Sequence, residues 1–437
     1  MHYDPIIRQS NPIVKLKMRH DAERLDMMAT DNGFDLPSAI KLFKQGGFAE
    51  ARKAFSQILV LAPDEKRALI YAGYIALLEN RLKAAEEYLG KAFKALPNSK
   101  TVKNLLYNVY YRQDNYAKAS LMLNSKKRRQ LAGELDYFRN RKPYETVPPA
   151  TRTELDFLVK DPLPLVQVVI NGAPPADFLI DTGGGELIID TEYAKSLGLK
   201  ELGSEMGTFG AGKKSTVITS YIDSIQLGGL QVKNLPVVLL DTRSFSYELY
   251  TNQFQVEGIL GTSMFYHFLT TLDYANNKIV FEPLDNSTES LLKSRPNNES
   301  YEHIPFWMAG DHFMLAKGKV NNRDDLLYFV DTGLAGNAFT CPKSTVKKCG
   351  FTLKKENKFY GAGGGGKMKS IPFDIESLSL GGVQENHLHG VYGPFPPSLE
   401  KSFGFTIDGL ISHEFFQNHT VTFDFSDMLL HIKRGVT

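Results

Sequence analysis

The stretch Phe178-Leu179-Ile180-Asp181-Thr182-Gly183 is followed much later in the chain by a close copy, Tyr328-Phe329-Val330-Asp331-Thr332-Gly333. In each copy an apolar run typical of a buried strand ends at a carboxylate, and the glycine that follows allows a tight turn. A single Asp-Thr-Gly triplet is weak evidence, because triplets recur by chance. Two of them, each directly after a predicted strand, indicate a duplicated domain.

Further landmarks repeat downstream of both triplets, in the same order and at nearly equal spacing. The duplication therefore predicts two all-β lobes, at residues 161–285 and 303–437, separated by a polar linker at residues 286–302. The matching pairs are Phe209-Gly210-Ala211-Gly212 with Tyr360-Gly361-Ala362-Gly363, Leu227-Gly228-Gly229 with Leu380-Gly381-Gly382, Gly258-Ile259-Leu260-Gly261 with Gly409-Leu410-Ile411-Ser412, and Leu272-Asp273-Tyr274 with Phe423-Asp424-Phe425.

The duplication predicts that equivalent residues meet on a pseudo-twofold axis, so Asp181 and Asp331 face each other. Two adjacent carboxyl groups cannot both ionise, and the pair shares one proton. The ionised member can take a proton from a water molecule while the protonated member polarises a carbonyl group. The two aspartates are therefore candidate catalytic residues for hydrolysis of an amide, with Gly183 and Gly333 making the turns.

Residues 161–435 resemble two fused copies of the retropepsin-like aspartic peptidase domain. The resemblance implies that Thr182 and Thr332 hydrogen-bond across the axis and hold the loops rigid. It also implies that the Gly-rich hairpins act as flaps over an extended peptide, and that neither a cofactor nor a metal is needed. Leu334 and Ser412 depart from the family pattern, so we expect the second aspartate loop to be remodelled. The flap residues that the resemblance implies are Phe209, Gly210, Ala211, Gly212, Tyr360, Gly361, Ala362 and Gly363.

The N-terminal part has a different repeat. Pro63 and Pro97 end two units 34 residues apart (97 − 63), and apolar residues within each unit recur at helical spacing. Residues 32–124 resemble tetratricopeptide repeats, which stack pairs of helices into a groove suited to an extended peptide. We expect an extension at residues 1–31, a capping helix and linker at residues 125–160, and a protein substrate or regulator bound by the repeats. A helical cap without a ligand is the alternative. The predicted fold class is an all-α helical-repeat domain joined to a duplicated all-β aspartic-protease fold.

Composition excludes several classes of function. The 51 Lys and Arg residues against 49 Asp and Glu residues give a net charge of +2, so nothing favours a nucleic acid or a membrane as partner.

The run Gly361 to Lys367 resembles a phosphate-binding loop, but Met368 stands where such a loop has a hydroxyl residue, and a strand-like pattern follows. His387 and His389 lack further ligands for a metal, and we predict no metal site.

The first thirty residues bear on the cellular compartment of the protein. Residues 1–30 contain no apolar run, so we expect a cytoplasmic protein, with a periplasmic or secreted protein as the alternative if a signal peptide has been removed.

The sequence thus predicts an aspartic endopeptidase whose single chain forms its own site. Two alternatives remain: a non-catalytic peptide-binding scaffold built on the same fold, and an enzyme whose lobes pair with those of another chain.

Overall fold

The computed structural model describes residues 35–149, 151–284, 301–361, 366–396 and 398–435. The chain forms two compact units, a helical unit and a β-rich unit, which confirms the predicted fold class. The helical unit contains the described residues 35–124 together with Ser398–Ile407, and the β-rich unit contains Ser125–Pro397 and Asp408–Thr437. Among the described residues, no helix has both the length and the apolar character needed to cross a bilayer.

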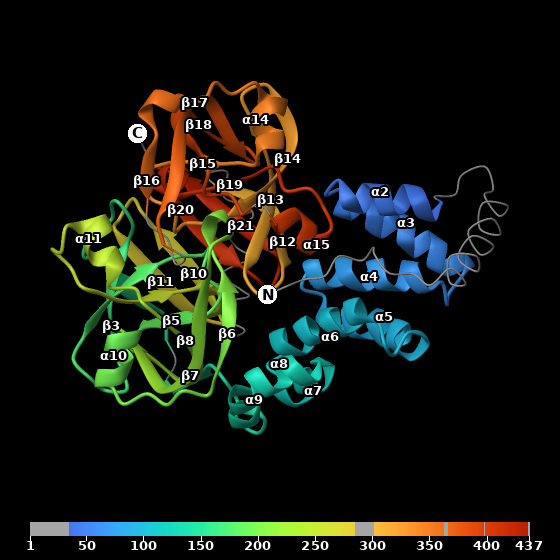
Figure 1. Cartoon of the computed structure of the whole chain (residues 1–437), viewed down its shortest axis with the longest axis horizontal. Helices are drawn as coiled ribbons and strands as arrows, with labels where there is room; N and C mark the ends of the chain where they lie inside the picture. The colour runs from blue at the N-terminus through green and yellow to red at the C-terminus, as the bar shows by residue number, and fades with distance from the viewer. Residues whose placement is uncertain (1–34, 150, 285–300, 362–365, 397, 436–437) are drawn as a thin grey trace. The chain divides into compact units, whose positions relative to one another are not determined.

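The helices of the first unit pack in consecutive pairs (Figure 1). Polar caps start several of them: Asp35 accepts a hydrogen bond from Ser38 N at 2.6 Å, and Asn115 accepts one from Lys118 N at 3.0 Å. Gly73 allows close packing, because a Cβ at that position would lie 2.6 Å from the side chain of Leu89. The helices are α2 (Leu36–Lys44), α3 (Phe48–Leu61), α4 (Lys66–Leu78), α5 (Leu82–Ala95), α6 (Lys100–Arg112) and α7 (Tyr116–Met122).

The segment Ser398–Ile407, which carries helix α15 (Leu399–Phe403), packs with these helices. The ring of Phe405 lies 4.9 Å from that of Phe48 and 5.6 Å from that of Phe43, between centroids. Thr406 N donates a hydrogen bond to the carbonyl of Lys44 at 2.9 Å. The segment falls within residues 303–437, which the sequence predicts as the second lobe. Its aromatic side chains instead bury their surface against the helical unit.

The first lobe of the β-rich unit is a sheet with the strand order β1-β8-β5-β9-β4-β3-β7-β6. Its central strands β4 and β9 each have four of five residues buried, so both faces of the sheet are covered there. The elements are β1 (Glu145–Thr146), β3 (Leu165–Ile170), β4 (Ala176–Ile180), β5 (Leu187–Asp190), α10 (Thr191–Ser196), β6 (Gly203–Thr208), η1 (Gly210–Gly212), β7 (Lys214–Leu227), β8 (Leu230–Leu240), α11 (Ser244–Tyr250), β9 (Val256–Leu260) and α12 (Thr262–Tyr266).

The second lobe repeats the pairings among β3 to β9, whereas the pairing of β1 with β8 has no counterpart among the described strands. β4 runs parallel to β9, with Ile180 opposite Leu260, and β14 runs parallel to β19, with Val330 opposite Ile411. The elements of the second lobe are β12 (Tyr301–Ala309), β13 (Phe313–Val320), β14 (Arg323–Val330), β15 (Phe339–Thr340), α14 (Lys343–Cys349), η3 (Lys355–Asn357), β16 (Phe359–Gly361), β17 (Met368–Leu380), β18 (Val383–Tyr392), β19 (Gly409–Ile411) and α16 (His413–Phe416).

A shared set of antiparallel strands joins the lobes. β10 of the first lobe pairs with β20 of the second, and Asp273 and Asp424 lie near the turns of the two flanking hairpins. Asp273 accepts a hydrogen bond from Asn276 N at 3.2 Å and Asp424 accepts one from Ser426 N at 2.9 Å, so both aspartates stabilise turns. The joining strands are β2 (Thr153–Asp156), β10 (Phe268–Asp273), β11 (Lys278–Pro283), β20 (His419–Asp424) and β21 (Leu429–Arg434).

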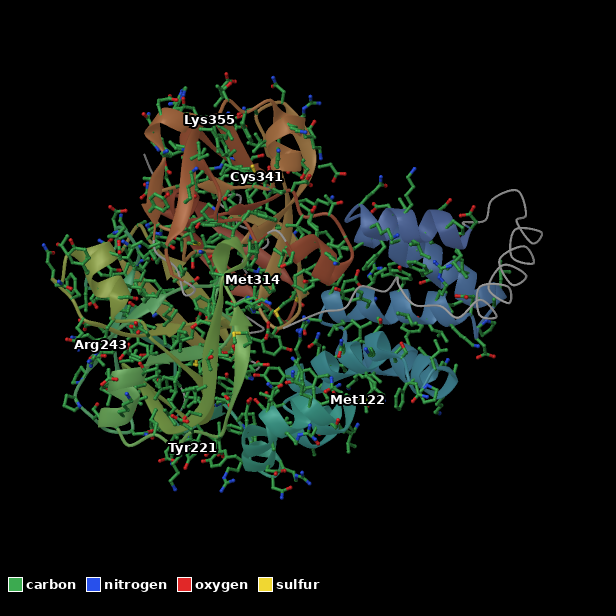
Figure 2. The ribbon with its side chains drawn as sticks, in the orientation of Figure 1. Met122, Tyr221, Arg243, Met314, Cys341 and Lys355 are labelled. Carbon is green, nitrogen blue, oxygen red and sulfur yellow. The ribbon has the colours of Figure 1, made fainter. Side chains whose placement is uncertain are left out.

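Two short helices, α8 (Ser125–Gln130) and α9 (Ala132–Phe138), precede the first lobe and pack on it. Tyr137 of α9 stacks on Tyr221 of β7, with ring centroids 3.8 Å apart. In the second lobe, Cys341 is fully buried and serves as a core side chain (Figure 2).

Candidate active site

The backbone around Asp181 and Asp331 is fixed by buried parallel strands. β4 ends at Ile180, and Asp181 N donates a hydrogen bond to the carbonyl of Leu260 at 3.2 Å. β14 ends at Val330, and Asp331 N donates in the same way to the carbonyl of Ile411 at 3.0 Å. Each aspartate therefore leaves the end of a strand that is held from both sides. The side chain has little freedom to move away.

The two carboxyl groups meet at the pseudo-twofold axis. Asp181 Oδ1 accepts a hydrogen bond from Gly183 N at 2.7 Å, and Asp331 Oδ1 accepts one from Gly333 N at 2.8 Å. A Cβ added at Gly183 would overlap the carboxyl of Asp331, and one added at Gly333 would overlap the carboxyl of Asp181. Glycine is required at both positions because each carboxyl lies directly against the opposite loop.

The threonines of the two loops exchange hydrogen bonds across the axis. Thr182 N donates to Thr332 Oγ1 at 3.1 Å, and Thr332 N donates to Thr182 Oγ1 at 3.0 Å. Both side chains are buried, and the Thr182 hydroxyl donates to the carbonyl of Val330 at 3.3 Å. Thr262 Oγ1 supports the first loop from below by donating to the carbonyl of Thr182 at 2.8 Å. The loops therefore form one rigid unit.

Ser412 holds the second loop differently from Gly261, its counterpart in the first lobe. A Cβ at Gly261 would overlap the carbonyl oxygen of Glu186, so the first loop admits only glycine there. The hydroxyl of Ser412 instead accepts from Leu334 N at 3.1 Å, and its one hydrogen lies between two acceptors, the carbonyls of Asp331 at 2.6 Å and Leu334 at 2.9 Å. Ser412 thus ties together the backbone of Asp331 and Leu334 in the second loop.

The electrostatics of the pair favour one shared proton. Burial raises the pKa of Asp181 above its ordinary value, against the hydrogen bond from Gly183 N and the nearby charge of His312. Burial and the negative charge of Asp181 together raise the pKa of Asp331 well above its ordinary value. The raised pKa of both carboxyls favours retention of a proton by the pair, and general acid–base catalysis needs one protonated and one ionised carboxyl.

Three titratable side chains that the sequence analysis did not single out lie beside this pair. The turn between β12 and β13 carries Asp311 and His312, with His312 Nδ1 2.6 Å from Asp311 Oδ1. A Cβ at Gly185 would lie 3.0 Å from His312 Nδ1, so the imidazole packs on the first aspartate loop. Burial, with a contribution from Asp311, raises the pKa of Glu186 to about 8. No sequence motif marks these residues, because a turn far along the chain brings them together.

The predicted flap residues lie on two hairpins. Phe209 and the turn Gly210–Gly212 connect β6 to β7, and Ala211 N donates a hydrogen bond to the carbonyl of Pro394 in the second lobe at 2.7 Å. Tyr360 and Gly361 lie on β16, which pairs with β17. Ala362 and Gly363 lie outside the described residues. The first hairpin therefore reaches across to the other lobe.

A pocket with a volume of about 480 Å³ lies beside the first hairpin. It is bordered by Thr216 and Ile218 of β7, by Leu239 at the end of β8, by Asp241 and Ser244 of the following turn, and by Gly366 near the start of β17. Its mixed polar and apolar lining suits a peptide side chain. Across the described residues, no group of three or more His, Cys, Asp or Glu side chains is arranged to hold a metal ion.

Comparison with known families agrees with this geometry. Residues 166–264, which cover most of the first lobe including Asp181, match the sequence model of the aspartyl protease family. The match supports an aspartyl protease domain in the first lobe and a general aspartic protease function. A search of curated protein sequences found no significant match.

Proposed function

We propose that the protein is an aspartic endopeptidase in which Asp181 and Asp331 activate a water molecule for hydrolysis of a peptide bond. The observation that carries the proposal is the contact of each carboxyl with the opposite glycine, held by the reciprocal Thr182 and Thr332 hydrogen bonds. Asp331, from the second lobe, completes the aspartyl protease domain of the first lobe.

The reaction follows from the shared proton. The ionised carboxylate takes a proton from a water molecule while the oxygen of that water attacks the amide carbon. The protonated carboxyl gives its proton to the carbonyl oxygen. Collapse of the resulting gem-diol breaks the carbon–nitrogen bond, and the amine nitrogen receives the proton taken from water. A hydroxyl proton of the gem-diol returns to the second carboxyl, so the pair regains its starting state. The chain's own residues supply every proton transfer.

One chain suffices for this site, because both aspartates and both threonines belong to it. The hairpins at Phe209–Gly212 and at Tyr360–Gly361 would cover an extended peptide, and the pocket beside the first hairpin would take one of its side chains. The proposed substrate is therefore a peptide or an unfolded protein segment.

The test is digestion of a mixed peptide library by the purified chain across about pH 4 to 7.5, because the pKa values of both aspartates are raised above that of a free carboxyl. Mass spectrometry identifies the new termini. We expect wild type to cleave and both Asp181→Asn and Asp331→Asn to be silent. Asp273→Asn, which alters a turn and the hydrogen bond from Thr420 Oγ1 on the lobe-joining strands, should retain activity. Cleavage by either dyad variant at the wild-type rate would overturn the proposal.

For the helical unit we propose a role in recruiting a protein substrate or regulator. Two apolar side chains near the end of α3 support it, since Val60 and Leu61 are 80% and 72% exposed. With casein as a probe, Val60→Glu with Leu61→Glu should raise KM while leaving KM for a short peptide unchanged. Equal KM values for casein in the variant and wild type would refute this role.

A further inference from the structure

The small net charge of the whole chain hides a strongly basic stretch in the second lobe. Residues 343–369 contain eight lysines, one glutamate and no arginine, so their net charge is 8 − 1 = +7, against +2 for the whole chain. The stretch includes α14, η3, β16 and the start of β17. Its lysines are Lys343, Lys347, Lys348, Lys354, Lys355, Lys358, Lys367 and Lys369.

Most of these lysines have no acidic partner. Lys348 lies 3.1 Å from a carboxylate oxygen of Asp408, and Lys354 lies 2.6 Å from one of Asp374. The other six lysines are exposed, and no ion pair neutralises any of them within the part of the chain that the structure describes. Their positive charge therefore faces solvent.

The hairpin of β16 and β17 has two different faces, because opposite residues of an antiparallel pair share a face. Gly361 lies opposite Met368, which is buried, and a Cβ added at Gly210 of the first hairpin would lie 2.8 Å from the sulfur of Met368. This face is turned toward the first hairpin. Tyr360 lies opposite Lys369 on the other face, and Tyr360 is 64% exposed.

Neighbouring lysines extend the exposed face of the hairpin. Lys358 has an extended backbone (φ −58°, ψ 140°) and lies two residues before Tyr360, so it shares the face of Tyr360. Lys355 of η3 lies on the outside of the second lobe (Figure 2), and η3 packs on β17. We call Lys355, Lys358, Tyr360 and Lys369 the lysine face.

We propose that the lysine face binds an anionic lipid surface. The ammonium group of lysine is a compact charge on a flexible stem, which suits attraction to many lipid headgroups at once. The ring of Tyr360 adds an apolar body with a polar tip, the type of side chain that is enriched where membrane meets water. Our expectation of no membrane partner rested on the net charge of the whole chain, which averages over this stretch.

The composition of the stretch favours lipid over nucleic acid. Arginine bonds phosphate groups in a bidentate way and is the preferred side chain for recognising nucleic acids, yet residues 343–369 contain none. The proposal also goes beyond the peptidase and does not depend on it. The face of Met368 stays free on the cleft side, so the hairpin can bind a membrane and cover a peptide at the same time.

Flotation of the full chain with lipid vesicles tests the proposal. Vesicles of phosphatidylglycerol and phosphatidylcholine should bind the wild type, and vesicles of phosphatidylcholine alone should not. Binding should be lost at about 1 M salt, where the screening length falls to about 3 Å. Equal binding to the two kinds of vesicle would overturn the proposal, because it would show that the lysines contribute nothing.

Paired variants show whether the lysine face is the part that binds. Each lysine near an anionic membrane raises binding by about fivefold, so Lys358→Gln with Lys369→Gln should weaken it by about 25-fold. The matched control is Lys53→Gln with Lys91→Gln, which changes the net charge equally at exposed positions of α3 and α5. The control should bind as the wild type does. Equal binding by the two double variants would contradict the assignment to this face.

Two further measurements place the tyrosine and exclude a nucleic acid. The emission of Tyr360→Trp should shift to shorter wavelength when the mixed vesicles are added, while that of the wild type, whose single tryptophan is Trp307, should not. An unshifted emission would show that the hairpin does not reach the lipid. Tighter binding to duplex DNA or to RNA than to the mixed vesicles, at equal phosphate concentration, would overturn the proposal in favour of a nucleic acid. Vesicle binding needs no peptide cleavage, so this inference and the proposed peptidase fail separately.

Discussion

Replacing Thr182 with valine tests whether the reciprocal threonine bonds hold the two lobes in register. Valine has nearly the same shape, so the change removes the hydroxyl and leaves little empty volume. That hydroxyl accepts from Thr332 N at 3.0 Å and donates to the carbonyl of Val330 at 3.3 Å, in a site with 0% exposure. An unsatisfied buried N–H costs about 1–3 kcal/mol and one lost hydrogen bond about 1 kcal/mol, so the expected loss of unfolding free energy is about 2–4 kcal/mol.

Thr332→Val is expected to cost less. Its hydroxyl accepts from Thr182 N at 3.1 Å, so the substitution leaves one buried N–H unsatisfied, at about 1–3 kcal/mol. Thr270→Val provides the matched control, because Thr270 is also fully buried and its hydroxyl has no hydrogen-bond partner among the described residues. The control should change stability by less than about 0.5 kcal/mol or increase it.

Urea unfolding followed by tryptophan fluorescence measures these differences. The chain has one tryptophan, Trp307 on β12, so the signal reports on the β-rich unit. The expected order of stability is Thr270→Val above Thr332→Val, with Thr182→Val lowest. Equal stability of Thr182→Val and Thr270→Val would refute the reasoning that these hydrogen bonds stabilise the site.

Three further predictions concern the site and the helical unit. Gly183→Ala places a Cβ against the Asp331 carboxyl and should lower kcat by about a hundredfold. The urea unfolding curve followed by Trp307 fluorescence should change little. An unchanged kcat would contradict the close contact. Asp331→Asn should raise Tm at pH 7 but leave Tm unchanged below the pKa of a free aspartate. The pKa of Asp331 is higher in the folded protein than in the unfolded chain, so the wild type loses stability as the pH rises above the unfolded pKa. Parallel curves of Tm against pH for the variant and the wild type would contradict this. Phe405→Ala should destabilise the helical unit by about 3–5 kcal/mol in circular dichroism melts, and an unaltered melt would show that the ring adds nothing.

The duplication could be predicted because strand, carboxylate and glycine recur in fixed order. The same pattern identified Asp181 and Asp331, since a repeated loop in a duplicated domain must lie at the pseudo-twofold axis. The helical unit was predictable from its period, but the packing of Phe405 against it was not. A short apolar segment between two strands looks the same in sequence whether it packs on its own lobe or on a neighbouring unit.

The asymmetry of the site could not be predicted either. Asp311 and His312 follow an unremarkable turn, and their contact with Gly185 depends on how the second lobe's turn reaches the first lobe's loop. The role of Ser412 also required the structure. Its departure from glycine was visible in the sequence, but its bonds to Asp331 and Leu334 depend on the three-dimensional course of the loop.

The most direct test of the central claim is to mix the two dyad variants. Wild type, Asp181→Asn, Asp331→Asn and an equimolar mixture of the two variants are incubated with the same peptide library, and new termini are counted by mass spectrometry. If one chain carries the complete dyad, wild type alone cleaves and the mixture stays silent. Cleavage by the mixture would place the working dyad between two chains, and no cleavage by wild type would contradict the proposed peptidase.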